Sequence, residues 1–301
     1  MFRSTEGSKP ARAPERAPEG VAAPARKPPM GSILIAAGRL TPENAALALR
    51  AAARRGVRFG EAGILLGFLK PEDVQFALAA QFSFPLVARD DATLASEVVA
   101  GYLPHHPVAE RMRALRVQLK LRCRGRRSGV VVAVCGPTRS DGRSFTASNL
   151  AVVFAQMGCR TLLIDADMRH PSQHRLFKID NRIGLSTLLA GRSGVESVRK
   201  SPALAGLHIL PSGPTPPNPL DLLESPLFDR VLAGADRNFG AVLIDTPAGA
   251  DGADAEVACA KAGFGIVVAR ASHTPPAAAR RYAAALSASD AKVLGVVFNE
   301  A

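Results

Sequence analysis

The stretch that most constrains the fold is an uninterrupted apolar run, Val130 to Cys135, that breaks into a loop and continues as a helix from Ser144. The loop reads Gly-Pro-Thr-Arg-Ser-Asp-Gly-Arg, starting at Gly136. Backbone N–H groups of such a loop, followed by a helix N-terminus, form a concave site for phosphate groups, and Ser144 is placed to bind magnesium. The strict phosphate-loop pattern has glycine where Pro137 stands and lysine where Arg143 stands, so the loop alone does not settle the function.

Two further apolar runs end in carboxylates. Thr161 to Ile164 is followed by Asp165 and Asp167, and Val242 to Ile244 is followed by Asp245. An unpaired carboxylate at the end of a buried strand is costly, and the carboxyl ends of parallel strands are where α/β proteins bind ligands. One terminal Asp could instead cap the next helix, but this alternative weakens when three of them surround one glycine loop. We expect these three carboxylates to hold magnesium and its water.

This loop, together with the motifs hhhDxDxR and hhhDTP, in which h is an apolar residue, resembles the motif set of the bacterial tyrosine kinases of exopolysaccharide export. These are the Wzc and CapB relatives, within the wider MinD/ParA type of P-loop ATPase. The family loop, S-x-x-x-G-E-G-K-[ST], aligns with Gly136 to Ser144, and the departures here are Ser140 and Arg143. An arginine at the lysine position, with Phe145 after the serine, is similar to the EpsG branch, the chain-length determinant tyrosine kinases. The resemblance covers about residues 104 to 301.

The resemblance implies ATP and Mg²⁺ as cofactors and a set of site residues. Loop amides would hold the phosphates, Arg143 would place its charge on the β and γ groups, and Asp165 or Asp167 would draw the proton from the attacking phenol. The implied nucleotide-binding residues are Thr138, Arg139, Ser140, Asp141, Gly142, Arg143, Ser144 and Phe145. The implied metal ligands are Ser144, Asp165 and Asp245, and the implied catalytic residues are Arg143, Asp165 and Asp167.

The chain before this region has two parts. Residues 1 to 30 alternate Pro, Ala, Arg and Glu without an apolar period, which predicts a disordered tail. A repeat follows in residues 31 to 100, because a shift that brings Gly31 onto Gly60 also brings Pro42 onto Pro71. Each half reads as a helix, a glycine-ended turn, and a second helix opened by the proline. The sequence therefore predicts two helical hairpins.

The second half of the repeat resembles the amino-terminal domain of type II secretion and pilus ATPases, of which the MshEN branch binds cyclic di-GMP. The residues that match its motif are Arg58, Gly60, Gly67 and Gln81. The first half has Pro29 and Ala52 at two of these positions, so its motif is eroded. This favours a purely structural or docking domain and leaves a cyclic di-GMP site as the alternative. A pilus-type motor is disfavoured, since the resemblance stops near residue 100.

Residues 81 to 107 are expected to link the domains, with a Pro-His-His-Pro breaker in which His105 and His106 are exposed and bind no metal. A basic helix follows from Glu110 to Arg122. Its apolar stripe and its basic stripe, at helical spacing, are Met112, Leu115 and Leu119, and Arg113, Arg116 and Lys120. Such a basic run is usually a solvated face or a patch for nucleic acid or anionic lipid. The helix also reproduces the E-x-x-R-x-x-R signature by which the resembled kinases assemble rings, which favours ring contact over lipid or another partner.

Strands and helices alternate through the rest of the chain. The expected strands begin at Val130, Thr161, Leu207, Ala241, Phe264 and Val293, and the expected helices span residues 144–157, 185–190, 226–232, 254–262 and 275–287. Between them, residues 213–223 resemble the family loop G-x-x-P-P-N-P-x-x-L-L. The predicted fold is α/β, a P-loop NTPase with a mainly parallel sheet. The expected parts are a tail (1–30), a small helical N-terminal domain (31–100), a linker with the basic helix (101–128) and the P-loop domain (129–301).

The expected function is that of an ATP-binding protein tyrosine kinase of exopolysaccharide polymerisation and export. No apolar run approaches the roughly 18 to 20 residues of a membrane span. The resemblance therefore implies a separate inner-membrane chain-length protein as partner, a cytoplasmic location at the inner membrane, and a homo-oligomeric ring without a nucleic-acid partner. Two alternatives remain: a catalytically degenerate regulator that binds nucleotide or cyclic di-GMP, and a MinD/ParA-like positioning ATPase.

The two tyrosines bear on what would be phosphorylated. Tyr282 lies in a helical run and is expected to pack half-buried, whereas Tyr102 is expected in a flexible segment and is the plausible acceptor. The resembled kinases commonly carry a tyrosine cluster beyond the final strand, and this sequence ends at Ala301 without one. We therefore expect little autophosphorylation.

Overall fold

The computed structural model describes residues 28–82, 84–87, 92–123 and 129–300. These residues fall into two compact units, one that ends at Leu69 and one that begins at Lys70. The predicted tail lies outside the described residues as far as residue 27, and the first helix begins at Met30.

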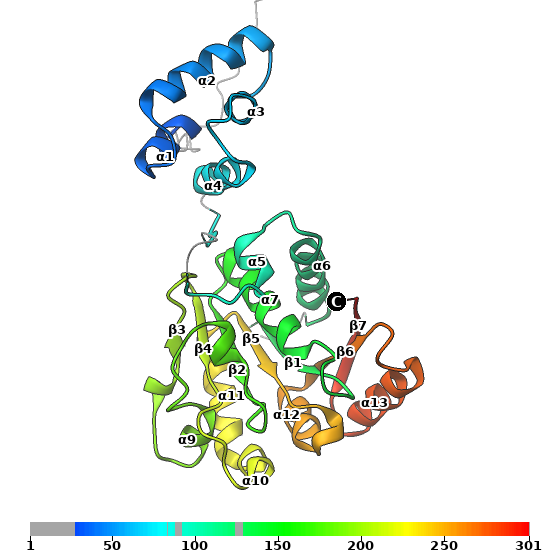
Figure 1. Ribbon diagram of the computed structural model, residues 1–301. Coiled ribbons are helices and arrows are strands. Elements are labelled where there is room, and N and C mark those ends of the chain that lie inside the picture. The colour runs from blue at the N-terminus through cyan, green and yellow to red at the C-terminus, as the bar shows by residue number, and fades with distance from the viewer. Residues whose placement is uncertain (1–27, 83, 88–91, 124–128, 301) are drawn as a thin grey trace, which may run out of the picture. The chain divides into compact units, whose positions relative to one another are not determined.

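Within its described residues the first unit is helical, with α1 Met30–Ala36, α2 Pro42–Arg55 and α3 Phe59–Leu65 (Figure 1). Local interactions determine where α2 starts. The Thr41 side chain accepts a hydrogen bond from the Asn44 amide at 3.2 Å, and proline occupies the first turn. The helix ends at Gly56, whose φ of 67° is unstrained for glycine. The fourth helix of the repeat, α4 Pro71–Gln81, also begins at its proline and is grouped with the second unit. The predicted helices of the repeat are confirmed.

In the described part of the second unit, a seven-stranded sheet has the order β3-β4-β2-β5-β1-β6-β7. Its strands are β1 Val130–Cys135, β2 Thr161–Asp165, β3 Arg199–Lys200, β4 Leu207–Leu210, β5 Ala241–Asp245, β6 Phe264–Arg270 and β7 Lys292–Asn299. Neighbouring strands are parallel except that β3 runs antiparallel to β4. The central strands β1, β2 and β5 are buried along their whole length, as expected for apolar runs covered on both faces. The prediction of a mainly parallel α/β fold is confirmed.

Helices cover both faces of the sheet and form two apolar clusters (Figure 1). One face carries α5 Val99–Tyr102, α6 Pro107–Arg122 and α7 Arg143–Gln156. The other carries α9 Leu185–Leu189, α10 Pro219–Glu224, α11 Pro226–Asn238, α12 Asp254–Ala262 and α13 Pro276–Ala288. The short helix α8 Gln173–Leu176 follows β2. In the described residues no helix is long and apolar enough to cross a bilayer.

The segment expected to be a linker packs instead on α7 over its described residues. Val87, Leu94 and Val98 are buried in the same cluster as the residues of β1 and α7. Two buried amides of α7 hold the segment: Asn149 Nδ2 donates to Glu97 O at 3.0 Å, and Gln156 Nε2 donates to Ala100 O at 2.8 Å. The linker interpretation is wrong here, because these apolar residues are too irregularly spaced to show a period in the sequence.

The same packing corrects the assignment of Tyr102 to a flexible segment. Tyr102 ends α5, is half-buried against the core, and its hydroxyl donates a hydrogen bond to Leu94 O at 2.5 Å. Tyr282 packs half-buried against the other cluster, as predicted, and burial raises the pKa of its hydroxyl well above the usual range. Both phenols are therefore tied to the fold.

A second correction concerns residues 213–223, which were expected to form a loop throughout. The end of this stretch is helix α10, which begins at Pro219 directly after Asn218. The reason is the position of the proline, whose fixed φ suits the first turn of a helix, followed by a Leu-Asp-Leu-Leu run. Leu223 is buried in the second cluster and anchors this helix to the domain.

The basic helix is α6, which begins at Pro107. Met112 and Leu119 are buried, as the apolar stripe predicts. The basic stripe is less open than expected, because Arg113 Nη1 donates to Pro104 O and to Glu110 Oε1, each at 2.6 Å. Arg116 Nη1 donates to Val153 O of α7 at 2.6 Å. Arg116 therefore anchors the helix to α7, whereas Arg113 is bound at the start of α6 itself.

The two histidines before α6 are exposed, as expected. His106 Nδ1 accepts a hydrogen bond from the Val108 amide at 3.2 Å and so caps the helix. Over the described ranges no three His, Cys, Asp or Glu side chains are grouped as a metal site would require.

Candidate functional site

The phosphate-loop candidate lies where the carboxyl ends of three strands meet. Parallel register places Val134 of β1 and Asp165 of β2 on either side of Asp245 of β5. The loop after β1 runs to Gly142, which has a φ of 95° and is the N-cap of α7. Amides in the first turn of a helix have no acceptor in an earlier turn, so this end of α7 offers donors to an anion.

Ser140 has a left-handed backbone, with a φ of 63°. This conformation is unstrained for glycine and costs other residues about 1 kcal/mol or more. The strain gives a physical reason why the family pattern has glycine at this position.

We expect Ser140→Gly to stabilise the second unit by about 0.5 kcal/mol, because relief of backbone strain exceeds the extra entropy that glycine gives the unfolded chain. Urea unfolding measures the change. Ser289→Gly is the matched control, since Ser289 has a φ of −96° and should gain nothing. A destabilised Ser140→Gly variant would contradict the strain argument.

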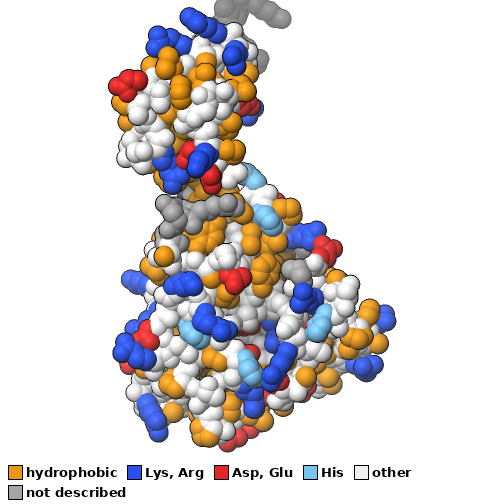
Figure 2. Space-filling view, viewed as in Figure 1, with side chains coloured by type: hydrophobic (Ala, Val, Ile, Leu, Met, Phe, Trp, Pro, Cys, Tyr) orange, Lys and Arg blue, Asp and Glu red, His pale blue; other side chains and the backbone are white. Residues whose placement is uncertain are grey.

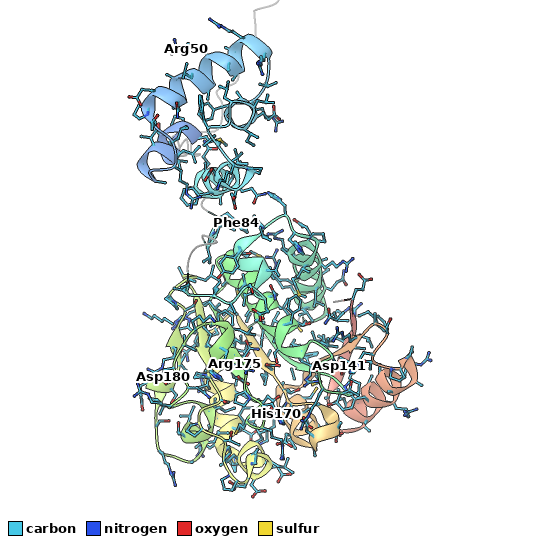
Figure 3. All side chains as sticks on the ribbon, viewed as in Figure 1. Arg50, Phe84, Asp141, His170, Arg175 and Asp180 are labelled. Atoms are coloured by element: carbon cyan, nitrogen blue, oxygen red, sulfur yellow. The ribbon has the colours of Figure 1, made fainter. Side chains whose placement is uncertain are left out.

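Asp141 is fully buried and organises the loop. Its carboxylate accepts hydrogen bonds from the Thr138 amide at 2.7 Å, the Thr138 hydroxyl at 2.6 Å and the Thr274 hydroxyl at 2.5 Å. Asn299 Nδ2 also donates to Asp141 O at 3.2 Å. Figure 3 labels this side chain beside the start of α7. The side chain of this predicted nucleotide-binding residue is thus committed to the loop itself.

Arg143 is almost completely buried, at 8% exposure. Its Nε donates to Thr246 O at 3.0 Å, and its Nη1 donates to Thr138 O at 2.5 Å. The guanidinium therefore joins the loop to the end of β5. The prediction that Arg143 reaches β- and γ-phosphate groups remains a prediction, and it requires these two bonds to be exchanged.

Asp165 and Asp245 are fully buried register partners on neighbouring strands. Asp165 Oδ2 accepts from the amides of Ser172 and Gln173 at 3.1 and 2.9 Å, so one oxygen does cap the next helix. Burial and the charge of Asp245 raise the pKa of Asp165 well above its usual range. Burial raises the pKa of Asp245 to about 6, and hydrogen bonds from Gln173 and Ser144 oppose this rise.

Gln173 connects these groups, and the sequence reasoning missed it. It is fully buried, and its Nε2 donates to Asp245 Oδ2 at 2.7 Å and to Ser144 O at 3.2 Å. The hhhDxDxR motif matched in the sequence assigns no role to a glutamine that follows it. The one available signal was its place in a short polar segment directly after the hhhDxDxR stretch.

Asp167 and Arg169 lie in the turn after β2. Asp167 is buried at 3% exposure, and its Oδ1 accepts a hydrogen bond from the His170 amide at 2.8 Å. Arg169 forms a two-pronged ion pair with buried Asp254, at 3.1 and 3.3 Å. Asp254 is a second residue that the sequence does not mark as part of the site, because it lies in α12, far along the chain from Arg169.

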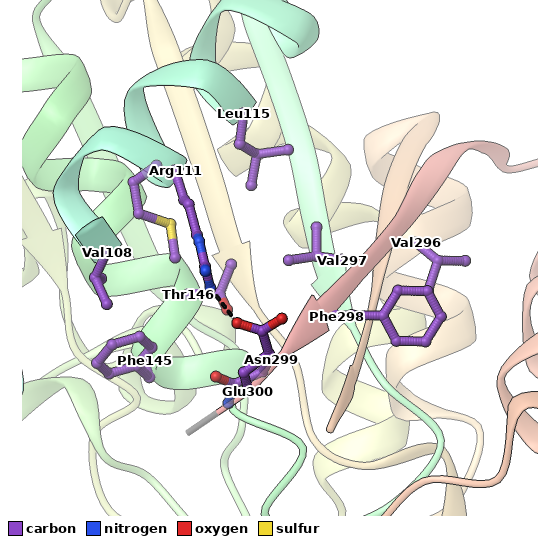
Figure 4. Close-up of a pocket in the computed structure, with 11 residues that line it drawn as sticks. Val108, Arg111, Leu115, Phe145, Thr146, Val296, Val297, Phe298, Asn299 and Glu300 are labelled. Carbon is purple, nitrogen blue, oxygen red and sulfur yellow. Dashed lines mark hydrogen bonds and ion pairs between the residues drawn. The ribbon is translucent and has the colours of Figure 1, made fainter. Parts of the chain in front are cut away.

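Two predicted nucleotide-binding side chains make other contacts in the structure. Arg139 is exposed and pairs with Asp251 at 2.8 Å. Phe145 lines a cavity of about 260 Å³ between α6, α7 and β7. Figure 4 shows Phe145 beside Val108 in this cavity, and the ion pair of Arg111 with Glu300 at 2.5 Å. The structure therefore groups Thr138, Asp141, Gly142, Arg143 and Ser144 with the three strand-end carboxylates, and places Phe145 apart from them.

The carboxylate pair fits a magnesium ion. Among the described residues, Oδ1 of Asp165 and Oδ1 of Asp245 are buried without a hydrogen-bond partner. Uncompensated buried carboxylate oxygens are costly, and Mg²⁺ prefers one or two carboxylates together with phosphate and water oxygens. Figure 2 shows many Lys and Arg side chains on the face in view, whereas Asp165 and Asp245 are fully buried.

No protein-family model matches the chain. It is 33% identical over 204 residues to tyrosine-protein kinase YwqD of Bacillus subtilis, a match that covers 67% of this chain and 85% of YwqD. It is 37% identical over 175 residues to tyrosine-protein kinase wzc of Salmonella typhimurium, covering 58% of this chain. The chain spans about a quarter of the length of this longer relative, 24%.

Among solved structures, the kinase domain of Escherichia coli tyrosine kinase ETK superposes with a TM-score of 0.66 and 28% identity. This match covers 70% of the present chain and 82% of the ETK domain. The similarity over 85% of YwqD, together with the match to the ETK kinase domain, leads to one conclusion. The chain belongs to the family of bacterial tyrosine-protein kinases, with a P-loop NTPase fold.

Proposed function

We propose that the second unit binds Mg-ATP and transfers its γ-phosphoryl group to protein tyrosine, in the assembly and export of an exopolysaccharide. The observation that carries this proposal is the pair of buried carboxylates, each with one unpartnered oxygen, at the loop that leads into α7. A purely structural site would leave the two unpartnered Oδ1 atoms without compensation for their burial.

Each residue has a proposed task. Amides of the loop and the first turn of α7 hold the phosphates, while Ser144 and the Oδ1 atoms of Asp245 and Asp165 hold the metal. Mg²⁺, when bound, neutralises charge on the phosphates. Arg143 turns from Thr138 O toward the same charge.

Asp167 or Asp165 accepts the proton of the phenol. The phenol oxygen then forms a bond to the γ-phosphorus as the bond to the bridging oxygen breaks, and ADP leaves. The fold contributes position and electrostatics.

The test is calorimetric binding of Mg-ADP, compared with turnover of Mg-ATP on a tyrosine-containing protein substrate. Asp245→Asn should weaken Mg-ADP binding by about 10- to 100-fold, since it removes a ligand charge. Asp229→Asn, at an exposed ion pair with Lys261, is the control and should bind normally. An absence of binding by the unaltered protein at millimolar Mg-ADP would reject the site.

The acceptor is proposed to be a tyrosine of another protein. The Tyr102 hydroxyl donates a hydrogen bond to Leu94 O, and Tyr282 is half-buried in the second cluster, so both would have to leave the core to reach a kinase site. Strong self-phosphorylation that persists in Tyr102→Phe would contradict this proposal.

A catalytically degenerate regulator is the second candidate. The observation in its favour is Arg143, whose guanidinium is buried and bonded to two carbonyl oxygens. This hypothesis predicts Mg-ADP binding without phosphoryl transfer in the same assay. If the arginine causes the loss of transfer, Arg143→Lys should restore it.

A ring of subunits in contact through α6, working with an inner-membrane chain-length protein, is also proposed. Its support is the Glu110-x-x-Arg113-x-x-Arg116 pattern on an accessible helix, where the Glu110 side chain is 59% exposed. Because Arg116 anchors α6 to α7, the informative variant is Glu110→Lys, which leaves that anchor intact. Light scattering that shows the same oligomer in this variant would argue against the ring.

For the first unit we propose a docking or structural role like that of type II secretion ATPase amino-terminal domains. Helices at the positions expected from the repeat support this proposal. Arg58, which is exposed, and Gly67, whose backbone is left-handed, also support it, because both stand at motif positions. A cyclic di-GMP site is the finer alternative. Calorimetry with cyclic di-GMP decides between them, and binding unaffected by Arg58→Ala would exclude the motif as its site.

A further inference from the structure

In each of the two site carboxylates, Asp165 and Asp245, one oxygen accepts hydrogen bonds from the chain itself. Asp165 Oδ2 is bound by the amides of Ser172 and Gln173, and Asp245 Oδ2 is bound by Gln173 Nε2 at 2.7 Å. In the described parts of the chain, the Oδ1 atoms have no hydrogen-bond partner, although both residues are fully buried. Each acid therefore offers one oxygen to a cation.

Gln173 is the residue common to both arrangements. Its backbone amide binds one acid and its side-chain amide binds the other, while the same nitrogen also donates to Ser144 O at 3.2 Å. Both neighbours of the side-chain amide are acceptors, so the nitrogen must face them. The fully buried side chain has no room to leave this position without a change in the site.

We propose that Gln173 determines which divalent cation the site accepts, by restricting Asp245 to one oxygen. Mg²⁺ takes single carboxylate oxygens in a tight octahedron, whereas Ca²⁺ takes more ligands and readily binds a carboxylate through both oxygens. With Oδ2 held by Gln173, Asp245 suits the smaller ion. Gln173 is thus a positioning residue, and this inference rests on the proposed Mg-nucleotide function.

The experiment compares Mg²⁺ and Ca²⁺ binding by calorimetry, each with and without ADP, for the full chain and for Gln173→Met. Methionine has a similar length and no donor, so it frees Asp245 Oδ2. The matched control is Gln156→Met, since Gln156 is also buried and donates to two carbonyl groups, Pro85 O at 3.1 Å and Ala100 O at 2.8 Å. In Gln173→Met the ratio of the two affinities should shift toward Ca²⁺ by about tenfold or more, while Gln156→Met keeps the original ratio.

The outcomes separate the two proposals. An unchanged ratio in a Gln173→Met protein that still binds Mg²⁺ overturns the role of Gln173 and leaves the proposed function standing. If the unaltered protein binds neither cation, with or without ADP, the proposed function fails and this inference fails with it.

If Gln173→Met does not fold, infrared spectra of the unaltered protein with ¹³C-labelled Asp decide the matter. Addition of Mg²⁺ should give the wide splitting of carboxylate stretches that marks one-oxygen binding. The narrow splitting of two-oxygen binding would overturn the inference.

Discussion

Replacement of Asp141 by alanine should lower the unfolding free energy of the second unit by about 3 to 5 kcal/mol, the usual cost of breaking a buried charged network by removal of one partner. The carboxylate accepts three hydrogen bonds within the loop and from Thr274, and it lies 4.0 Å from the Arg143 guanidinium. Without it, buried donors lose their acceptor and the arginine loses its nearest counter-charge. Urea unfolding followed by circular dichroism measures the change.

The control for this prediction is Asp180→Ala. Asp180 pairs with Arg182, whose side chain is 89% exposed, and such surface pairs contribute at most about 1 kcal/mol. The network interpretation fails if Asp141→Ala is no more damaging than Asp180→Ala. Asp141→Asn should lie between the two, because an amide keeps one acceptor oxygen and cannot serve all three donors.

Without divalent cations, the second unit should lose stability as the pH rises from about 4 to about 6. Burial raises the pKa of Asp245 from 3.8 to about 6, so between these values the native state binds more protons than the unfolded state. The unfolding free energy then falls with pH, by up to about 3 kcal/mol over a shift of this size. The raised pKa of Asp165 acts in the same direction. Urea unfolding in EDTA at a series of pH values gives the slope.

Asp245→Asn should remove most of this slope, whereas Asp229→Asn, at an exposed ion pair, should leave it unchanged. Mg²⁺ should reverse the trend, since metal binds the deprotonated carboxylates and its stabilisation grows with pH. Identical slopes in the unaltered protein and in Asp245→Asn would show that Asp245 does not titrate in this range.

The strand–loop–helix unit, the carboxylates at the strand ends and the order of strands and helices could be read from the sequence. Each depends on neighbouring residues: an apolar run long enough for a buried strand, a glycine before a helix start, an acid directly after the run. For the same reason the prolines at Pro42 and Pro71 marked the starts of α2 and α4. Helix α10 was missed, although Pro219 starts it in the same way, because its few residues follow a proline-rich stretch.

The direction of each side chain in the site was decided by contacts between residues far apart in the chain. Asp141 is held by Thr274 across 133 positions, and Gln173 meets Asp245 across 72. Arg143 turns to Thr246 O across 103 positions, a partner that no local pattern names. Likewise, buried side-chain amides of α7 hold the segment that contains Tyr102, across 49 to 56 positions of the chain.

The physical reason is that a buried polar group must find a partner wherever the fold brings one within reach. Sequence spacing sets which residues arrive at the edge of the sheet, because strands and helices have fixed periods. Which donor then meets which acceptor depends on how the elements pack. Thus the sequence determined the loop and the acids of this kinase-family domain, and the tertiary structure alone decided that Gln173 joins them.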